Sequence, residues 1–197
     1  MKILIDNGHG EDTPGKRSPK WPDGTQLFEW KYTREIALRV ETELREQGID
    51  VERIVKENTD IPLSERCKRA NAIAVNVGVK NCLLVSIHNN ASNTGRASGW
   101  EIHTYLGKSK SDEYATNFWD EAKAIFPMGT KMRGDWTDKD PDFDSNFAIL
   151  RDTKCAAVLI ENLFMDNQDD CRYLLSDEGK AAIVKIHVLS ILKIAGK

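Results

Sequence analysis

One short stretch of the chain is apolar almost throughout, and it limits the possible folds more than any other feature. Residues 82–87, Cys-Leu-Leu-Val-Ser-Ile, are too few for a typical helix and lack the polar alternation of a strand with one wet face. Such a run is typical of a central strand that is covered on both faces. We therefore expect a sheet with helices packed on each side.

Strand-like and helical patterns alternate along the rest of the chain. The pattern predicts further strands at 2–5, 49–55, 99–105, 147–150 and 156–160, and helices at 27–47, 62–76, 109–126 and 177–194. Gly48 is expected to end the first helix, and Asp60 or Thr59 to cap the second. The alternation predicts an α/β fold: a single domain over residues 1–197, with a central mixed, mainly parallel sheet flanked by helices on both faces.

Composition and charge argue against several classes of protein. With 28 basic and 31 acidic residues the formal net charge is −3, so electrostatics give no reason to expect nucleic-acid binding. The apolar run at 3–5 is too short for a signal peptide, and no run is long enough to be inserted in a membrane. The cysteines show neither C-x-x-C nor zinc-ribbon spacing and are predicted to be reduced, structural thiols.

Three of the apolar runs are closely followed by a residue that can bind a metal or transfer a proton. His9 follows the first predicted strand, His88 follows the run at 82–87, and Glu161 follows the last predicted strand. Ligands of open α/β sheets bind outside the carboxyl ends of the strands. We therefore expect these three side chains to meet in one crevice.

Glu29 is a fourth candidate. At 100° per residue it shares the inward arc of its helix with Thr33, Ile36, Val40 and Leu44. An inward carboxylate needs a partner, although it could simply complement the helix dipole. Because two histidines and a carboxylate form a common catalytic zinc set, His9, Glu29 and His88 are predicted to bind zinc. Glu161 could then take a proton from water and return it to a leaving amine.

The remaining polar motifs are predicted to have no catalytic role. His103 lies within a predicted strand and His187 within the last helix, so both are expected to be structural or exposed. The sequence contains neither a G-x-G-x-x-G loop opening a helix nor a G-x-S-x-G elbow. The acidic run at 138–144 lacks the glycine and the final glutamate of a calcium-binding loop.

Taken in order, the motifs resemble those of the zinc-dependent N-acetylmuramoyl-L-alanine amidases of the amidase type 3 family. Residues 6–10 are similar to the family's Asp-x-Gly-His-Gly segment, and residues 86–90 to its Ser-x-His-x-Asn segment. Glu29 stands where the family has its metal-binding glutamate, and Glu161 where it has the catalytic one. One departure is Leu163, which occupies a position where the family usually has glycine.

The resemblance implies a peptidoglycan substrate and hydrolysis of the amide bond between N-acetylmuramic acid and L-alanine. Glu161 would be the catalytic residue and His9, Glu29 and His88 the zinc ligands. Asp6 and Asn90 could orient ligands or substrate or only support turns, and Arg151 could hold a stem-peptide carboxylate or simply be exposed. Two alternatives are another zinc peptidase or carboxypeptidase of similar architecture and a weakly active cell-wall-binding module.

The resemblance also bears on where the protein acts. Without a signal peptide, we expect either a phage-type endolysin that is cytoplasmic on synthesis and reaches the cell wall after release, or a secreted enzyme trimmed to its catalytic domain. The oligomeric state is open, with a monomer expected.

Overall fold

A single mixed sheet organises the computed structural model, which describes all residues 1–197. The strand order is β2-β1-β3-β6-β4-β5. The strands are β1 (Lys2–Asn7), β2 (Asp50–Arg53), β3 (Cys82–Asn90), β4 (Glu101–Thr104), β5 (Phe143–Asp144) and β6 (Ala156–Phe164). Strands β2, β1, β3 and β6 are parallel, whereas β4 runs antiparallel to β6 and parallel to β5. The prediction of a mixed, mainly parallel sheet is confirmed.

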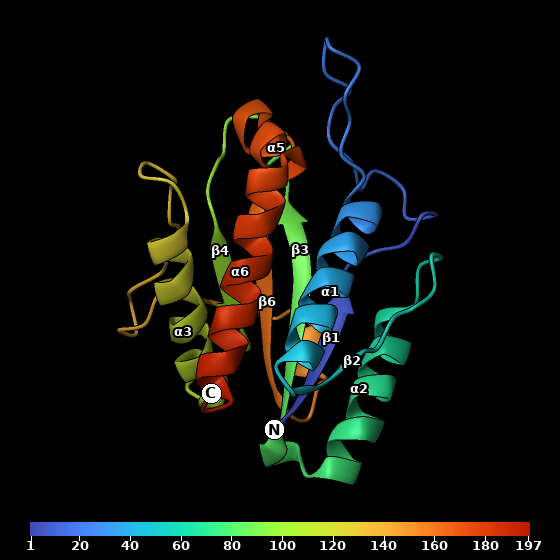
Figure 1. The fold of residues 1–197 in the computed structure, drawn as a ribbon, viewed down its shortest axis with the longest axis vertical. Helices are drawn as coiled ribbons and strands as arrows, with labels where there is room; N and C mark the ends of the chain where they lie inside the picture. Colours follow the sequence, from blue (N-terminus) through green and yellow to red (C-terminus); the bar gives the residue numbers. More distant parts are fainter.

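Helices cover both faces of this sheet. They are α1 (Glu29–Glu46), α2 (Leu63–Val77), α3 (Lys110–Ile125), α4 (Ala148–Arg151), α5 (Gln168–Leu175) and α6 (Asp177–Ile194), with a short 3-10 turn at Val79–Asn81. Figure 1 shows α1, α6 and α3 side by side across one face, and α2 and α4 pack on the other. None of the helices combines the length and the apolar character needed to cross a membrane.

Alternate residues of the central strands enter two separate apolar cores. Leu83 and Val85 of β3 face the core beneath α1, α3 and α6, whereas Leu84 faces the core beneath α2 and α4. All three side chains are fully buried, which explains why this run shows no polar alternation. Burying each of them stabilises the fold by roughly 1.5–3 kcal/mol. The two cores hold the strand register, and the register decides which residues emerge at the carboxyl ends.

Three segments differ from the sequence prediction, the first of them the short strand β5, which was not predicted. The strand predicted at 147–150 is wrong, because Ala148–Arg151 forms α4 and buries Ile149 and Leu150 in the core that α2 also covers. Periodicity cannot separate a strand from a helix in so short an apolar run. Helix α5 was not predicted; Asn167 caps it by accepting hydrogen bonds from the amides of Asp169 and Asp170.

The ends of the first two helices give one confirmed prediction and one correction. Gly48 has a φ of +72° directly after the last turn of α1, as expected of a helix-ending glycine. The predicted cap of the second helix is wrong, because Pro62 occupies the cap position and no side chain bonds the first turn.

All four cysteines are free and buried, which confirms the prediction that they are reduced, structural thiols.

Candidate active site

His9, Glu29 and His88 lie together at the carboxyl ends of β1 and β3 and the start of α1. Their potential ligand atoms all lie within 4.8 Å of one another. Nε2 of His9 is 3.4 Å from Oε2 of Glu29, and Nδ1 of His88 is 3.2 Å from Oε1 of the same carboxylate. The structure thus brings together the three side chains predicted as metal ligands, and their role as ligands stays a prediction.

The carboxylate of Glu29 lies at the centre of this cluster and is only 1% exposed. Its Oε1 also accepts a hydrogen bond from the amide of Asn89, whereas its buried Oε2 has no hydrogen-bond partner. A buried carboxylate oxygen without a donor is costly. A divalent cation bound between the two imidazoles and this oxygen would satisfy it.

The turn that carries His9 leaves no room for a side chain at the residue before it or at the residue after it. A Cβ atom on Gly8 would lie 2.2 Å from Cε1 of His88, and one on Gly10 would lie 2.0 Å from the backbone nitrogen of Asp60. His9 itself has a φ of +61°, a left-handed conformation that costs an L-residue roughly 1–2 kcal/mol. The Gly-His-Gly sequence therefore lets the chain bring the His9 ring edge-on to the His88 ring, with 5.0 Å between their centroids.

Burial and the shared carboxylate set the charges of the cluster. Burial lowers the pKa of His9 to about 4, although the negative charge of Glu29 opposes this effect. Burial also acts to lower the pKa of His88, but the hydrogen bond and charge of Glu29 outweigh it and leave that pKa raised. Burial acts to raise the pKa of Glu29, and the hydrogen bond and charge of His88 outweigh it, so this pKa is lowered. An ionised Glu29 and a neutral His9 are the forms that bind a cation.

Glu161 lies beside the cluster because of strand register. It pairs with His88 across the parallel strands β6 and β3, so both side chains leave the same face of the sheet. Both line a pocket of about 280 Å³ together with His9 and Glu29. Burial raises the pKa of Glu161 to about 7, and its Oε2 is buried without a partner. A carboxyl group of this kind can both hold and release a proton near neutral pH.

The backbone just after Glu161 has a conformation at position 163 that favours glycine, although this chain has leucine there. Leu163 has a φ of +64°, which glycine adopts without steric cost. The leucine side chain is 2% exposed and packs in the core beneath α1, α3 and α6. The chain thus keeps the left-handed geometry that favours glycine and adds an apolar contact to it.

The three further candidates lie in different places. Both carboxylate oxygens of Asp6 are already bonded, one to Arg66 and one to the hydroxyl of Ser86. The Asn90 amide lines the pocket and donates to Glu101. Arg151 is not brought to this pocket: it is the last residue of α4, at the opposite end of the sheet where β3 and β6 begin, and is exposed and paired with Asp152.

The two other histidines lie outside the cluster, as the sequence predicted. His103 is buried on β4 and contacts Ser145 and Glu101. His187 is buried in α6, where its Nδ1–H donates to the carbonyl of Ile183.

Sequence reasoning missed two charged residues of the site. Lys16 lines the pocket from the loop after His9, and its positive charge acts to lower the pKa values of His9 and Glu161. Glu101 of β4 is the antiparallel partner of Glu161 and is bonded by Arg133. Lys16 lies in an aperiodic loop that carries no signal, whereas Glu101 could have been found as an acidic residue in a predicted strand.

Comparison with known proteins is consistent with this arrangement. A sequence model described as N-acetylmuramoyl-L-alanine amidase matches residues 3–193. The endolysin of Bacillus phage SPP1 is 28% identical over 198 residues, which cover 98% of this chain and 65% of that protein. A sporulation-specific N-acetylmuramoyl-L-alanine amidase of Bacillus subtilis strain 168 is 28% identical over 191 residues, 95% of this chain and 65% of that protein. The chain therefore spans slightly less than two thirds of the length of these relatives.

A solved structure has the same fold over the whole chain. The N-acetylmuramoyl-L-alanine amidase of Clostridium difficile 630 superimposes with a TM-score of 0.82 at 24% sequence identity, covering 100% of this chain and 97% of the other. The single α/β domain inferred from the sequence is thus that of a solved amidase.

Proposed function

Because this chain belongs to the N-acetylmuramoyl-L-alanine amidase family, we propose that it is a zinc-dependent amidase that acts on peptidoglycan. The bond cleaved joins the lactyl carbonyl of N-acetylmuramic acid to the nitrogen of the first L-alanine of the stem peptide. One observation carries the proposal: His9, Glu29 and His88 meet beside Glu161 in a single pocket.

Zinc fits this donor set. Two imidazole nitrogens and a carboxylate oxygen form a common set of catalytic zinc ligands, with bonds of about 2.0–2.2 Å. The candidate ligand atoms lie within 4.8 Å of one another, and the two histidines contact different oxygens of Glu29, His9 at 3.4 Å and His88 at 3.2 Å. When bound, zinc supplies Lewis-acid chemistry, which polarises the scissile carbonyl and acidifies water.

Glu161 carries the proton transfers of the proposed reaction. Its carboxylate takes a proton from the attacking water and delivers it to the alanine nitrogen, which leaves as a neutral amine. A pKa of about 7 in the metal-free protein suits both steps, and a neighbouring cation would lower that pKa and favour the base.

The shape of the surface suits an extended substrate. The pocket around Glu161 has a volume of about 280 Å³, which is at the small end for a whole ligand. Two hollows of about 520 and 700 Å³ adjoin it, and both share Gly15 with it. The pocket would therefore hold the scissile bond, with the rest of the muramyl peptide lying along the adjoining hollows.

Product analysis tests the proposal. Purified peptidoglycan is digested with the zinc-loaded protein, and the fragments are identified by mass spectrometry. We expect intact stem peptides with a free L-alanine amino group, loss of this product after chelation, and its return when zinc is added. Cleavage inside the stem peptide would instead identify a peptidase. Binding to peptidoglycan without any released product would identify a wall-binding module.

A further inference from the structure

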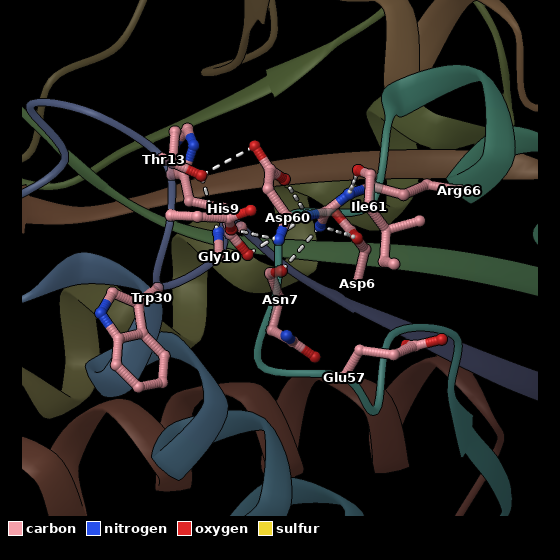
Figure 2. Close-up of polar contacts among 12 residues, drawn as sticks. Asp6, Asn7, His9, Gly10, Thr13, Trp30, Glu57, Asp60, Ile61 and Arg66 are labelled. Atoms are coloured by element: carbon pink, nitrogen blue, oxygen red, sulfur yellow. Dashed lines mark hydrogen bonds and ion pairs between the residues drawn. The ribbon is translucent and has the colours of Figure 1, made fainter.

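A buried arginine lies behind the metal cluster and uses every hydrogen-bond donor that it has. Arg66 of α2 is 2% exposed. Its bonds run from Nε to the Ile61 carbonyl (2.6 Å), from Nη1 to Asp6 Oδ1 (2.7 Å) and the Asn7 carbonyl (2.8 Å), and from Nη2 to Asp60 Oδ1 (2.9 Å) and the His9 carbonyl (3.2 Å). A guanidinium has five N–H donors, so none is left over. Figure 2 shows these bonds, three of which reach residues at or just after the end of β1.

The same group of residues holds both polar atoms of one peptide unit, the one that joins His9 to Gly10. Its carbonyl accepts from Arg66, and its N–H donates to Oγ1 of Thr13 over 2.9 Å. The Thr13 hydroxyl in turn donates to Oδ2 of Asp60 over 2.7 Å, and the other oxygen of Asp60 accepts from Arg66. Arg66, Asp60 and Thr13 thus form a closed ring around this peptide unit, which we call the Arg66 clamp (Figure 2).

We propose that the Arg66 clamp is a positioning device that holds His9 in its metal-binding conformation; this inference rests on the proposed zinc site. None of the three side chains is in the ligand cluster itself. Their effect passes through the backbone of His9, whose left-handed φ of +61° is unfavourable for a free chain. Fixing the peptide plane after His9 limits its ψ and therefore the direction of its imidazole.

The clamp also connects the two histidines. Asp6 accepts from Arg66 through Oδ1 and from the Ser86 hydroxyl through Oδ2, over 2.7 and 2.6 Å. Ser86 lies on β3 two residues before His88. The Arg66 guanidinium therefore contacts the His9 turn directly, and it is linked to β3 through the Asp6 carboxylate. The two carboxylates around Arg66 also compensate its buried charge, which is a requirement for keeping an ion inside a fold.

Zinc affinity is the first test, measured by competition with a chromogenic chelator. Thr13→Val removes the bridging hydroxyl at nearly constant volume, whereas Thr13→Ser retains it. Asp60→Ala opens the ring of hydrogen bonds. Arg66→Lys replaces the five N–H donors of the guanidinium by the three of an ammonium group. Residues that orient metal ligands typically contribute 10- to 100-fold in metal affinity. We expect losses of about that size for Thr13→Val, Asp60→Ala and Arg66→Lys, and near wild-type affinity for Thr13→Ser.

A matched control separates positioning from general stability. Arg53 of β2 bonds the buried carboxylate of Glu41 over 2.6 Å, and neither residue belongs to the ligand cluster or lines its pocket. Arg53→Lys therefore removes guanidinium donors from a buried carboxylate, as Arg66→Lys does, and should leave zinc affinity unchanged. Affinities within twofold of the wild type for Thr13→Val and Asp60→Ala in folded protein would overturn the proposal. So would an equal loss of affinity for Arg53→Lys.

Amide hydrogen exchange in the metal-free protein tests the clamp independently of the reaction. The Gly10 amide should be protected in the wild type and in Thr13→Ser, and should exchange at least tenfold faster in Thr13→Val and Asp60→Ala. Unchanged Gly10 exchange would refute the clamp even if the wild type is an active amidase. Conversely, the wild type could fail to bind zinc while Thr13→Val and Asp60→Ala still speed up Gly10 exchange. That result would refute the proposed function and leave the hydrogen-bonded clamp in place.

Discussion

His88 of β3 and Glu161 of β6 are register partners on adjacent parallel strands, so an imidazole predicted to bind zinc and the predicted base leave the sheet side by side. A slip of one residue between these strands would turn one of the two side chains to the opposite face. The buried residues on both faces of β3 and β6 prevent that slip. The apolar cores therefore determine the geometry of the chemistry.

Glu161→Gln should abolish peptidoglycan hydrolysis while leaving zinc bound. The amide keeps the size of the carboxylate but cannot accept the proton from water, and general acid–base groups typically contribute about 10²–10⁴-fold in rate. Release of soluble muropeptide and zinc content of the purified protein would be measured together. Glu113→Gln, on an exposed glutamate of α3, is the control. Wild-type hydrolysis by Glu161→Gln would exclude this carboxylate as the base.

Gly8→Ala should weaken zinc binding more than it weakens the fold. A Cβ atom at this position would lie 2.2 Å from the His88 ring, which must then move out of the cluster. We expect at least a tenfold loss of zinc affinity by chelator competition. Gly129→Ala is the matched control, because its φ of +97° makes alanine costly by about 1 kcal/mol although no atom lies nearby. If both variants lose zinc equally, the steric explanation is wrong.

Replacing Leu163 should reverse the usual order of alanine and glycine. Both small residues lose the buried leucine contacts, which we expect to cost about 2–5 kcal/mol. Only glycine escapes the steric cost of a φ of +64°. Leu163→Gly should therefore be about 1 kcal/mol more stable than Leu163→Ala in urea unfolding. An alanine variant as stable as the glycine variant would show that the left-handed conformation is not retained.

His187 should make the fold sensitive to mild acid. Burial lowers its pKa to about 4, below the value of about 6.5 expected in the unfolded chain. As pH falls through 6.5 the unfolded chain takes up the proton first, so stability is lost progressively down to about pH 4. The full shift corresponds to about 3 kcal/mol.

The variant His187→Leu removes this titration while keeping an apolar filling beside Phe118. Urea unfolding of metal-free wild type and variant at pH 7 and pH 4.5 would give the two slopes. We expect the variant to lose less stability over this range than the wild type. Parallel pH profiles for the two proteins would mean that His187 is not the titrating group.

Local patterns determine a large part of this protein. The apolar run at 82–87, the helical spacing after Glu29 and the stop at Gly48 depend on neighbours within a few residues, and each is found as predicted. Glu29 could be singled out because a carboxylate on an apolar stripe is unusual. Arg66 has the same kind of signal, since it shares the inward stripe of its helix with Ala70 and Ala74.

Only the tertiary structure decided what these side chains contact. Arg66 meets His9 across 57 positions of sequence, and Glu29 meets Asn89 across 60. Such contacts depend on how helices dock on the sheet and on strand order, which no local periodicity encodes. The apolar segment before Arg151 became a helix for the same reason, because its short run fits either form and the space beneath α2 selected one. The sequence alone thus determined most of the elements and the reactive residues, whereas long-range packing decided the form of the ambiguous segment and the distances, charges and partners of the reactive groups.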